Sequence, residues 1–126
     1  MQMTATNIKE IAISFLRDAA AGRMDEAYAR VTSNFRHHNP HFKGDADSLK
    51  AGMAEAHRKF PNTTLEIQHV LKEGEMVAVH SRVRHSAELS EIAVVHLFRF
   101  ENDRIAELWD VGIEAPKDSP NEHGIF

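Results

Sequence analysis

The chain has 126 residues, of which 42% are hydrophobic and 27% are charged, a composition typical of one soluble globular domain. Its formal net charge of −4 argues against a nucleic-acid or anionic-membrane partner, since both favour a basic surface. There is no cysteine, which excludes disulfides, a thiolate nucleophile and zinc–thiolate sites. No apolar run approaches the roughly 20 residues that span a bilayer, so we expect a cytoplasmic protein without a membrane partner.

The first half of the chain is patterned as helices. Residues 7–21 carry apolar side chains at three- and four-residue intervals, which places them on one stripe of a helix. A shorter helix is expected over about 25–32. A third helix opens at Asp47 or Asp45, a residue type that caps helix N-termini, and stops at Pro61.

The second half alternates apolar and polar residues with a period of two, the pattern of half-buried strands. Strands are expected over about 65–72 and 77–84, followed by a hairpin with arms at 92–101 and 104–113. Helices followed by strands predict an α+β fold. We expect three N-terminal helices packed on a curved, mostly antiparallel sheet, within a single domain that spans residues 1–126.

The two arms of the hairpin hold one imidazole and one carboxyl group among apolar and aromatic residues. Hairpin pairing puts His96 opposite roughly Leu108 to Asp110, where cross-strand Cβ atoms lie about 4.5–5.5 Å apart. An ionisable group among core-type residues costs free energy unless it is paired or used. His96 and Asp110 are therefore a candidate centre for removing a proton beside a carbonyl. The alternatives are a satisfied polar pair and an ion pair between Asp110 and an arginine.

Three of the nine histidines fall within the segment 37–41. Adjacent His37 and His38 on an extended segment point to opposite sides, and no carboxylate completes a recognisable metal-ligand spacing. We therefore expect no metal and no other cofactor, with a metal site in this segment as the open alternative.

Outward-facing residues indicate a second copy of the chain. Alternation puts His80 in phase with Arg82 and Arg84, on the sheet face away from the core. We consider His80 both as a pocket residue and as part of a subunit interface. Trp109 is out of phase with Asp110, and an outward Trp on a sheet is best explained by burial against a second subunit. The sequence therefore predicts a homodimer.

The hairpin also resembles a known family. The segment Arg99–Glu107 followed by Trp109–Val111 is similar to the signature hairpin of SnoaL-like proteins, in the nuclear transport factor 2-like superfamily. His38–Pro40, Val77–His80 and the closing 121–126 agree with that family. The resemblance implies a cystatin-type α+β cone over nearly the whole chain, with a small apolar carbonyl compound as ligand.

The resemblance carries over two residues and marks two departures. Polyketide cyclases of this superfamily use an Asp on the last strand as acid/base with a His on the preceding strand, and Asp110 and His96 match these positions. Members often have Asp where this chain has His96, and often His where it has Leu108. The resemblance also places His38 and Asn39 at the mouth of the cone, with His38 within reach of a ligand carbonyl.

Two functions are consistent with these features. The first is a cofactor-independent acid/base enzyme (a cyclase, isomerase or aldol-type lyase) that acts on an apolar carbonyl compound through Asp110 and His96. His38, His80 and Phe98 are its candidate substrate contacts, Phe98 as an aromatic residue that lines the central pocket. The alternative is a non-catalytic binding module, in which the same cone holds a small apolar ligand and the polar groups only orient it.

Overall fold

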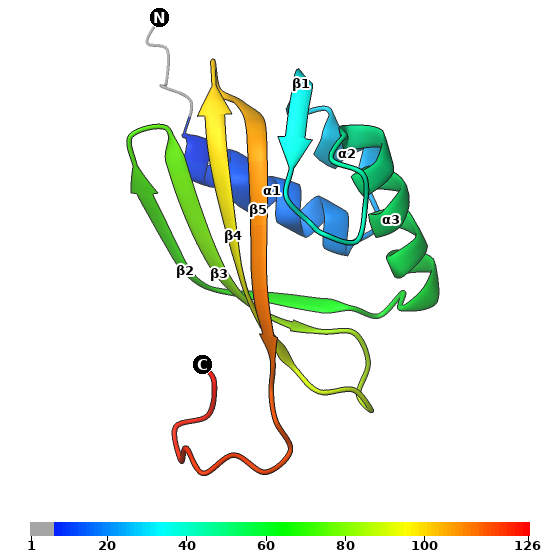
Figure 1. Ribbon diagram of the computed structural model, residues 1–126, viewed down its shortest axis with the longest axis vertical. Coiled ribbons are helices and arrows are strands. Elements are labelled where there is room, and N and C mark those ends of the chain that lie inside the picture. Colours follow the sequence, from blue (N-terminus) through cyan, green and yellow to red (C-terminus); the bar gives the residue numbers. More distant parts are fainter. Residues whose placement is uncertain (1–6) are drawn as a thin grey trace, which may run out of the picture.

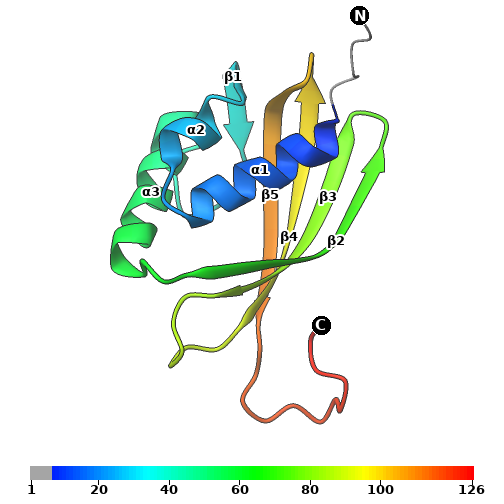
Figure 2. The same cartoon turned by 180° about the vertical axis from the view of Figure 1, so that it is seen from behind.

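In the computed structural model, which describes residues 7–126, three helices cover the concave face of one five-stranded sheet (Figures 1 and 2). The helices are α1 (Ile8–Ala20), α2 (Met24–Tyr28) and α3 (Ala46–Lys59). The strands are β1 (Val31–His37), β2 (Thr64–Glu73), β3 (Met76–Arg84), β4 (Ile92–Glu101) and β5 (Arg104–Glu114). None of these helices has the length and apolar character needed to cross a membrane. The predicted α+β cone is confirmed.

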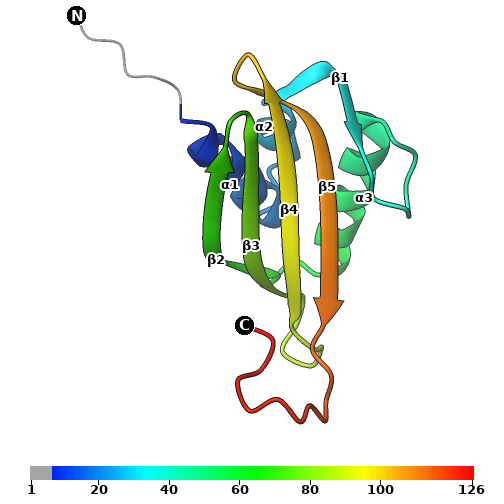
Figure 3. The ribbon, with the colours of Figure 1, turned by 60° about the vertical axis from the view of Figure 1, so that its left-hand side comes forward.

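The sheet is a meander with one added strand at its edge. Its order is β1-β5-β4-β3-β2, in which β2 to β5 pair antiparallel in chain order and β1 pairs with β5 in parallel (Figure 3). Strands β4 and β5 coincide with the expected hairpin arms, except that β5 runs on to Glu114. Between them, Asn102 and Asp103 take φ values of 49° and 63°, the left-handed conformation that a tight hairpin turn requires.

Side-chain caps explain where the two longer helices begin. The Asn7 side chain accepts a hydrogen bond from the Lys9 backbone N–H at 3.0 Å, directly before α1. The Asp45 side chain accepts one from the Ser48 backbone N–H at 3.1 Å, so Asp45 rather than Asp47 opens α3.

The prediction of a helix over 25–32 is wrong in its second half. Helix α2 ends at Tyr28, and the chain then enters β1, a strand that the local pattern did not indicate. The Ile105 backbone N–H donates to the Arg30 carbonyl at 2.9 Å, so pairing with β5 begins directly after the helix. The β-branched Val-Thr pair that follows fits a strand better than a helix.

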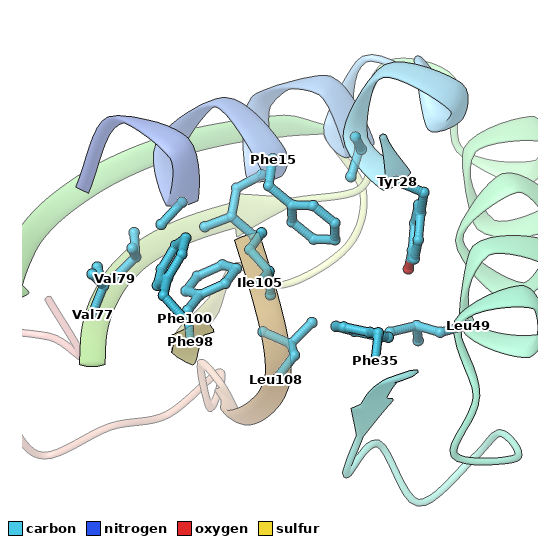
Figure 4. Packing of buried hydrophobic residues seen from close by; sticks show 14 of the residues in the cluster. Phe15, Tyr28, Phe35, Leu49, Val77, Val79, Phe98, Phe100, Ile105 and Leu108 are labelled. Atoms are coloured by element: carbon cyan, nitrogen blue, oxygen red, sulfur yellow. The ribbon is translucent and has the colours of Figure 1, made fainter. Parts of the chain in front are cut away.

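The hydrophobic core fills the end of the cone near the β4–β5 turn (Figure 4). Phe15 on α1 packs edge-on against both Tyr28 and Phe98, with ring centroids 5.3 and 5.9 Å apart. Further buried side chains of this cluster are Phe35, Leu49, Val77, Val79, Phe100, Ile105 and Leu108. Beyond this packed end, where β4 begins and β5 ends, the cone contains a cavity.

Candidate functional site

A cavity of about 310 Å³ lies between the sheet and the C-terminal halves of α1 and α3. Most of its wall is aliphatic, formed by Leu16, Ala19, Ala20, Met53, Ala56, Leu65, Val83, Ile92 and Val94. The polar residues of the wall are Asn39, His57, Thr63, His85, His96 and Asp110. An apolar cavity with a few converging polar groups is the usual form of a small-molecule site.

His96 on β4 and Asp110 on β5 are direct partners across the hairpin, and both line the cavity. The Asn39 Nδ2 donates a hydrogen bond to Asp110 Oδ2 at 3.0 Å. The Asn39 Oδ1 accepts from the His41 backbone N–H at 3.0 Å, which fixes the amide orientation. Among residues 7–126, no hydrogen bond joins His96 directly to Asp110, and no arginine forms an ion pair with Asp110.

His96 carries no charge at neutral pH. Burial lowers the pKa of its imidazole to about 4, although the Asp110 carboxylate pulls this pKa upward. The Nδ1 atom of His96 is buried and has no hydrogen-bond partner in the described part of the chain. The site therefore combines a carboxylate, positioned by an amide, with an uncharged imidazole that has spare hydrogen-bonding capacity.

Sequence reasoning missed two further imidazoles in the cavity wall, His57 and His85. His57 lies on α3 one helical turn after Met53, and His85 follows β3 two residues after the inward-facing Val83. In both cases the signal was an ionisable residue in phase with apolar ones. The same signal identified His96.

A close approach of α1 to α3 fixes the position of His57. A Cβ atom at Gly22, just after α1, would lie 2.5 Å from Nε2 and Cδ2 of the His57 ring. Only glycine therefore fits at this position without moving the ring. The Nδ1 atom of His57, like that of His96, is buried without a partner among the described residues.

The structure corrects the expected placement of His38. Its Nε2 lies 2.6 Å from Glu107 Oε2, and its ring stacks on Trp109 with centroids 5.0 Å apart, on the outer face of the sheet. Neighbouring side chains along an extended segment point to opposite sides, so Asn39 faces the cavity and His38 does not. Of the two residues expected at the mouth of the cone, Asn39 lines the cavity and His38 does not.

His80 and Phe98 also lie outside the cavity wall. His80 is out of phase with the inward residues of β3, and its Nδ1 lies 3.1 Å from His69 Nδ1 on the outer face. Phe98 is fully buried in the core (Figure 4). On β4, Phe98 is the next inward-facing residue after His96, in the direction of the packed end of the cone. The two ring centroids are 6.2 Å apart. Phe98 thus packs beside His96 and is not among the side chains that line the cavity.

In the segment 37–41, the side chains of His37 and His38 point to opposite sides of the chain, as expected. His37 is buried and donates from Nε2 to the Lys43 carbonyl at 2.6 Å, whereas His38 points outward. Within residues 7–126, no group of three or more His, Asp or Glu side chains is arranged to hold a metal ion.

The outer face carries an ion cluster that the sequence did not single out. The Glu107 side chain is 6% exposed and binds Arg36 at 2.9 Å, His38 at 2.6 Å and Arg99 at 3.0 Å. Hydrogen bonds from Arg36 and His38 hold the pKa of Glu107 at about 2, against an ordinary value of 4.5. Because these residues come from β1, its following loop, β4 and β5, the cluster ties the edge strand to the sheet.

The fold and the site together define a class of protein: an α+β cone of the nuclear transport factor 2-like type, with a mostly apolar cavity between its helices and its sheet. The family model of the SnoaL-like domain matches residues 12–108, and the chain belongs to this family. The matched segment ends two residues before Asp110. No functionally curated protein matches the chain.

Solved structures with the same fold come from several bacteria. An uncharacterised cystatin-fold protein of Novosphingobium aromaticivorans is 19% identical, with 85% of this chain and 99% of that chain covered and a TM-score of 0.73. A SnoaL-like protein of unknown function from Burkholderia thailandensis is 18% identical, with 89% and 99% covered and a TM-score of 0.71. IdmH of Streptomyces antibioticus, a proposed polyketide cyclase, is 19% identical, with 85% and 92% covered and a TM-score of 0.67. At these identities the likeness establishes the fold alone.

Proposed function

We propose that this protein catalyses proton transfer on a small apolar carbonyl compound, using Asp110 as the base and His96 as a hydrogen-bond donor. The observation that carries the proposal is the pairing of these two side chains, directly opposite one another, in the wall of an otherwise mostly aliphatic cavity. The cavity volume of about 310 Å³ is at the lower end of the range of small-molecule sites.

The chemistry follows from the charges of the two groups. Asp110 removes a proton from the carbon next to the carbonyl, and the C–H electron pair moves into the enolate. The Asn39 amide holds one carboxylate oxygen at 3.0 Å and orients the group. His96 is uncharged, and a neutral imidazole N–H beside a developing enolate oxygen stabilises it, as in other enolising enzymes. Asp110 then returns the proton to another atom of the enolate, or the enolate carbon attacks a second carbonyl, whose π electrons move to its oxygen, and this oxygen takes the proton from Asp110.

The aliphatic wall supports this chemistry in two ways. It binds the apolar body of a ligand by burying its surface, and a ligand bound there displaces water from around the carboxylate. A base and a hydrogen-bond donor in a poorly solvated cavity act more strongly than the same groups in water. The likeness of fold to IdmH, a proposed polyketide cyclase, is consistent with a substrate of this class.

We also propose that two copies of the chain associate through the outer face of the sheet. Val111 and Ile113 on β5 point away from the cavity and are 66% and 61% exposed, next to the half-buried Trp109. Large apolar side chains gathered on one face favour burial against a partner. Arg82 on β3 is already covered by the Phe126 ring at 4.6 Å, so the open part of this face lies over β4 and β5.

Hydrogen–deuterium exchange into a simple ketone tests the catalytic proposal without knowledge of the natural substrate. We expect the protein in D₂O to accelerate exchange of the α-protons of 2-tetralone, a rigid apolar ketone, above the buffer rate as measured by ¹H NMR. The His80→Leu variant, which loses an imidazole on the outer face, serves as a control and should retain this activity. Binding of 2-tetralone without accelerated exchange would contradict catalysis and favour the binding module.

A further inference from the structure

The end of the cavity remote from Asp110 holds a histidine whose protonation pattern is fixed by its neighbours. The Thr63 hydroxyl donates to the Phe60 carbonyl at 2.8 Å, which uses its only proton. At its 3.1 Å contact with His85 Nδ1, the Thr63 oxygen must therefore accept. The proton of the neutral His85 ring consequently lies on Nδ1, and Nε2 holds a free lone pair.

The His85 ring is also held in place. It stacks on Phe60, the residue that follows α3, with ring centroids 5.2 Å apart and planes inclined by 29°. Among residues 7–126, Nε2 of His85 has no hydrogen-bond partner. The ring lines both the central cavity and a neighbouring opening formed by residues 59–62 and 84–88. Nε2 is therefore the one polar atom that this ring can offer to a ligand.

The side chains of β3 and β4 that line the cavity between His85 and His96 are apolar: Val83, Ile92 and Val94. On β3, Val79 lies opposite His96 and Val83 lies opposite Ile92. His85 is therefore six residues further along the chain than the residue that lies opposite His96. Six positions correspond to up to about 20 Å along a straight strand, and to less across the concave face. The sheet side of the cavity thus has His96 and Asp110 toward one end, His85 toward the other, and aliphatic side chains between them.

We propose that His85 is the second polar anchor of this cavity and that its Nε2 accepts a hydrogen bond from a hydroxyl group at the far end of an elongated apolar carbonyl substrate. The proposal rests on the proposed function, since that function places the carbonyl end at His96 and Asp110. A neutral ring with its proton committed to Thr63 accepts a hydrogen bond but donates none to the ligand. It therefore selects a hydroxyl over an ether or a second carbonyl, whose oxygen would leave Nε2 unpaired.

Three rod-shaped ketones test this selection: 4-acetylbiphenyl, its 4′-hydroxy derivative and its 4′-methoxy derivative. By isothermal titration calorimetry, we expect the hydroxy compound to bind the wild-type protein about three- to tenfold more tightly than the methoxy compound, as for one net hydrogen bond. The His85→Phe variant keeps an aromatic ring over Phe60 but has no Nε2, and it should lose this preference. His80→Phe, the matched change on the outer face, should keep it. Equal binding of the two compounds by the wild type, or an unchanged preference in His85→Phe, would overturn the proposal.

A spectroscopic measurement tests whether Thr63 fixes the position of the proton on the His85 ring or only supports the local structure. Long-range ¹H–¹⁵N correlation spectra should place the proton of neutral His85 on Nδ1 in the wild type and in Thr63→Ser. In Thr63→Val, which has no hydroxyl, the proton should no longer be confined to Nδ1. A wild-type proton on Nε2 would contradict the proposal. A hydroxyl preference without ketone exchange would refute the proposed catalysis alone, and exchange without the preference would refute the role of His85 alone. Failure of all three biphenyls to bind would contradict the role of His85, whereas the proposed catalysis is decided by exchange into 2-tetralone.

Discussion

At the scale of single residues, the site depends on an imidazole that folding keeps uncharged. Burial lowers the pKa of His96 to about 4 from an ordinary 6.5, so this ring binds a proton in the unfolded chain before it does so in the folded one. Above pH 6.5 neither state is protonated at this position. Between pH 6.5 and pH 4 only the unfolded chain takes up the proton, and the free energy of unfolding must fall as the pH falls.

The His96→Leu variant should remove this pH dependence. The difference in pKa between the two states corresponds to about 3 kcal/mol, lost progressively between pH 6.5 and pH 4. Urea unfolding of both proteins at pH 7.5 and at pH 4 measures it. We expect the stability of the variant relative to the wild type to increase by about 2–3 kcal/mol at the lower pH. A difference that does not vary with pH would contradict a buried neutral His96.

The sequence could place His96 opposite roughly Leu108 to Asp110, because the Asn102-Asp103 turn sets the register at the start of the hairpin. A one-residue register shift between Arg99 and Phe100, which the sequence did not indicate, then brings Asp110 instead of Trp109 opposite His96. Once the register is known, period-two alternation decides which residues face His96. The direction of His38 could not be predicted in this way, because β1, the strand directly before it, was not recognised from the sequence and its pairing with β5 was unknown. His85 was predictable from its phase with Val83, but the hydrogen bonds that fix its proton were not.

At the scale of elements, the contact between the end of α1 and α3 controls one wall of the cavity. Gly22 has φ of 82° and leaves no room for a Cβ beside His57. The Gly22→Ala variant should be destabilised by about 1–3 kcal/mol, because alanine is strained in the left-handed region and its methyl group displaces the His57 ring. Thermal unfolding followed by circular dichroism measures the loss.

Gly74→Ala is the matched control for this prediction. Gly74 in the β2–β3 turn also has positive φ, at 59°, but its Cβ would meet no atom within 4 Å. It should therefore lose only the conformational part, about 1 kcal/mol. If Gly22→Ala proves no more destabilising than Gly74→Ala, the contact with His57 does not hold this wall.

The elements that the sequence predicted well are those whose pattern is local. Helix α1 shows a clear apolar stripe, and β4 and β5 are long alternating strands joined by a tight turn. The edge strand β1 was missed because its pairing with β5 joins segments that are far apart in the chain. A short helix followed by an edge strand has too few residues for either period to be recognised.

At the scale of the whole molecule, the exposed apolar residues of β5 lead to a prediction about assembly. Light scattering at micromolar concentration should give the mass of a dimer for the wild type and shift toward the monomer for Val111→Lys. Val111 is 66% exposed, so the change leaves the folded chain intact but places a charge in the proposed interface. Leu89→Lys, at an exposed leucine in the β3–β4 connection, is the control and should remain dimeric. A monomeric wild type would contradict the proposed interface.

The cone fold is compatible with more functions than the particular side chains of the cavity are. Solved relatives with this fold include proteins of unknown function beside a proposed polyketide cyclase. One fold can hold different chemistries, so the function is decided by the particular groups in the cavity. Here those groups are a carboxylate held by an amide, a neutral imidazole, and two further imidazoles in the wall.

The most direct test of the account is the rate of α-proton exchange into 2-tetralone for Asp110→Asn compared with Asp103→Asn. The first change removes the proposed base with a nearly isosteric side chain and should leave the fold intact. The second makes the same substitution in the β4–β5 turn, where asparagine tolerates the positive φ of 63°. We predict that exchange falls by about 10²–10⁴-fold in Asp110→Asn and stays at the wild-type rate in Asp103→Asn. Exchange at the wild-type rate in a folded Asp110→Asn would contradict Asp110 as the base.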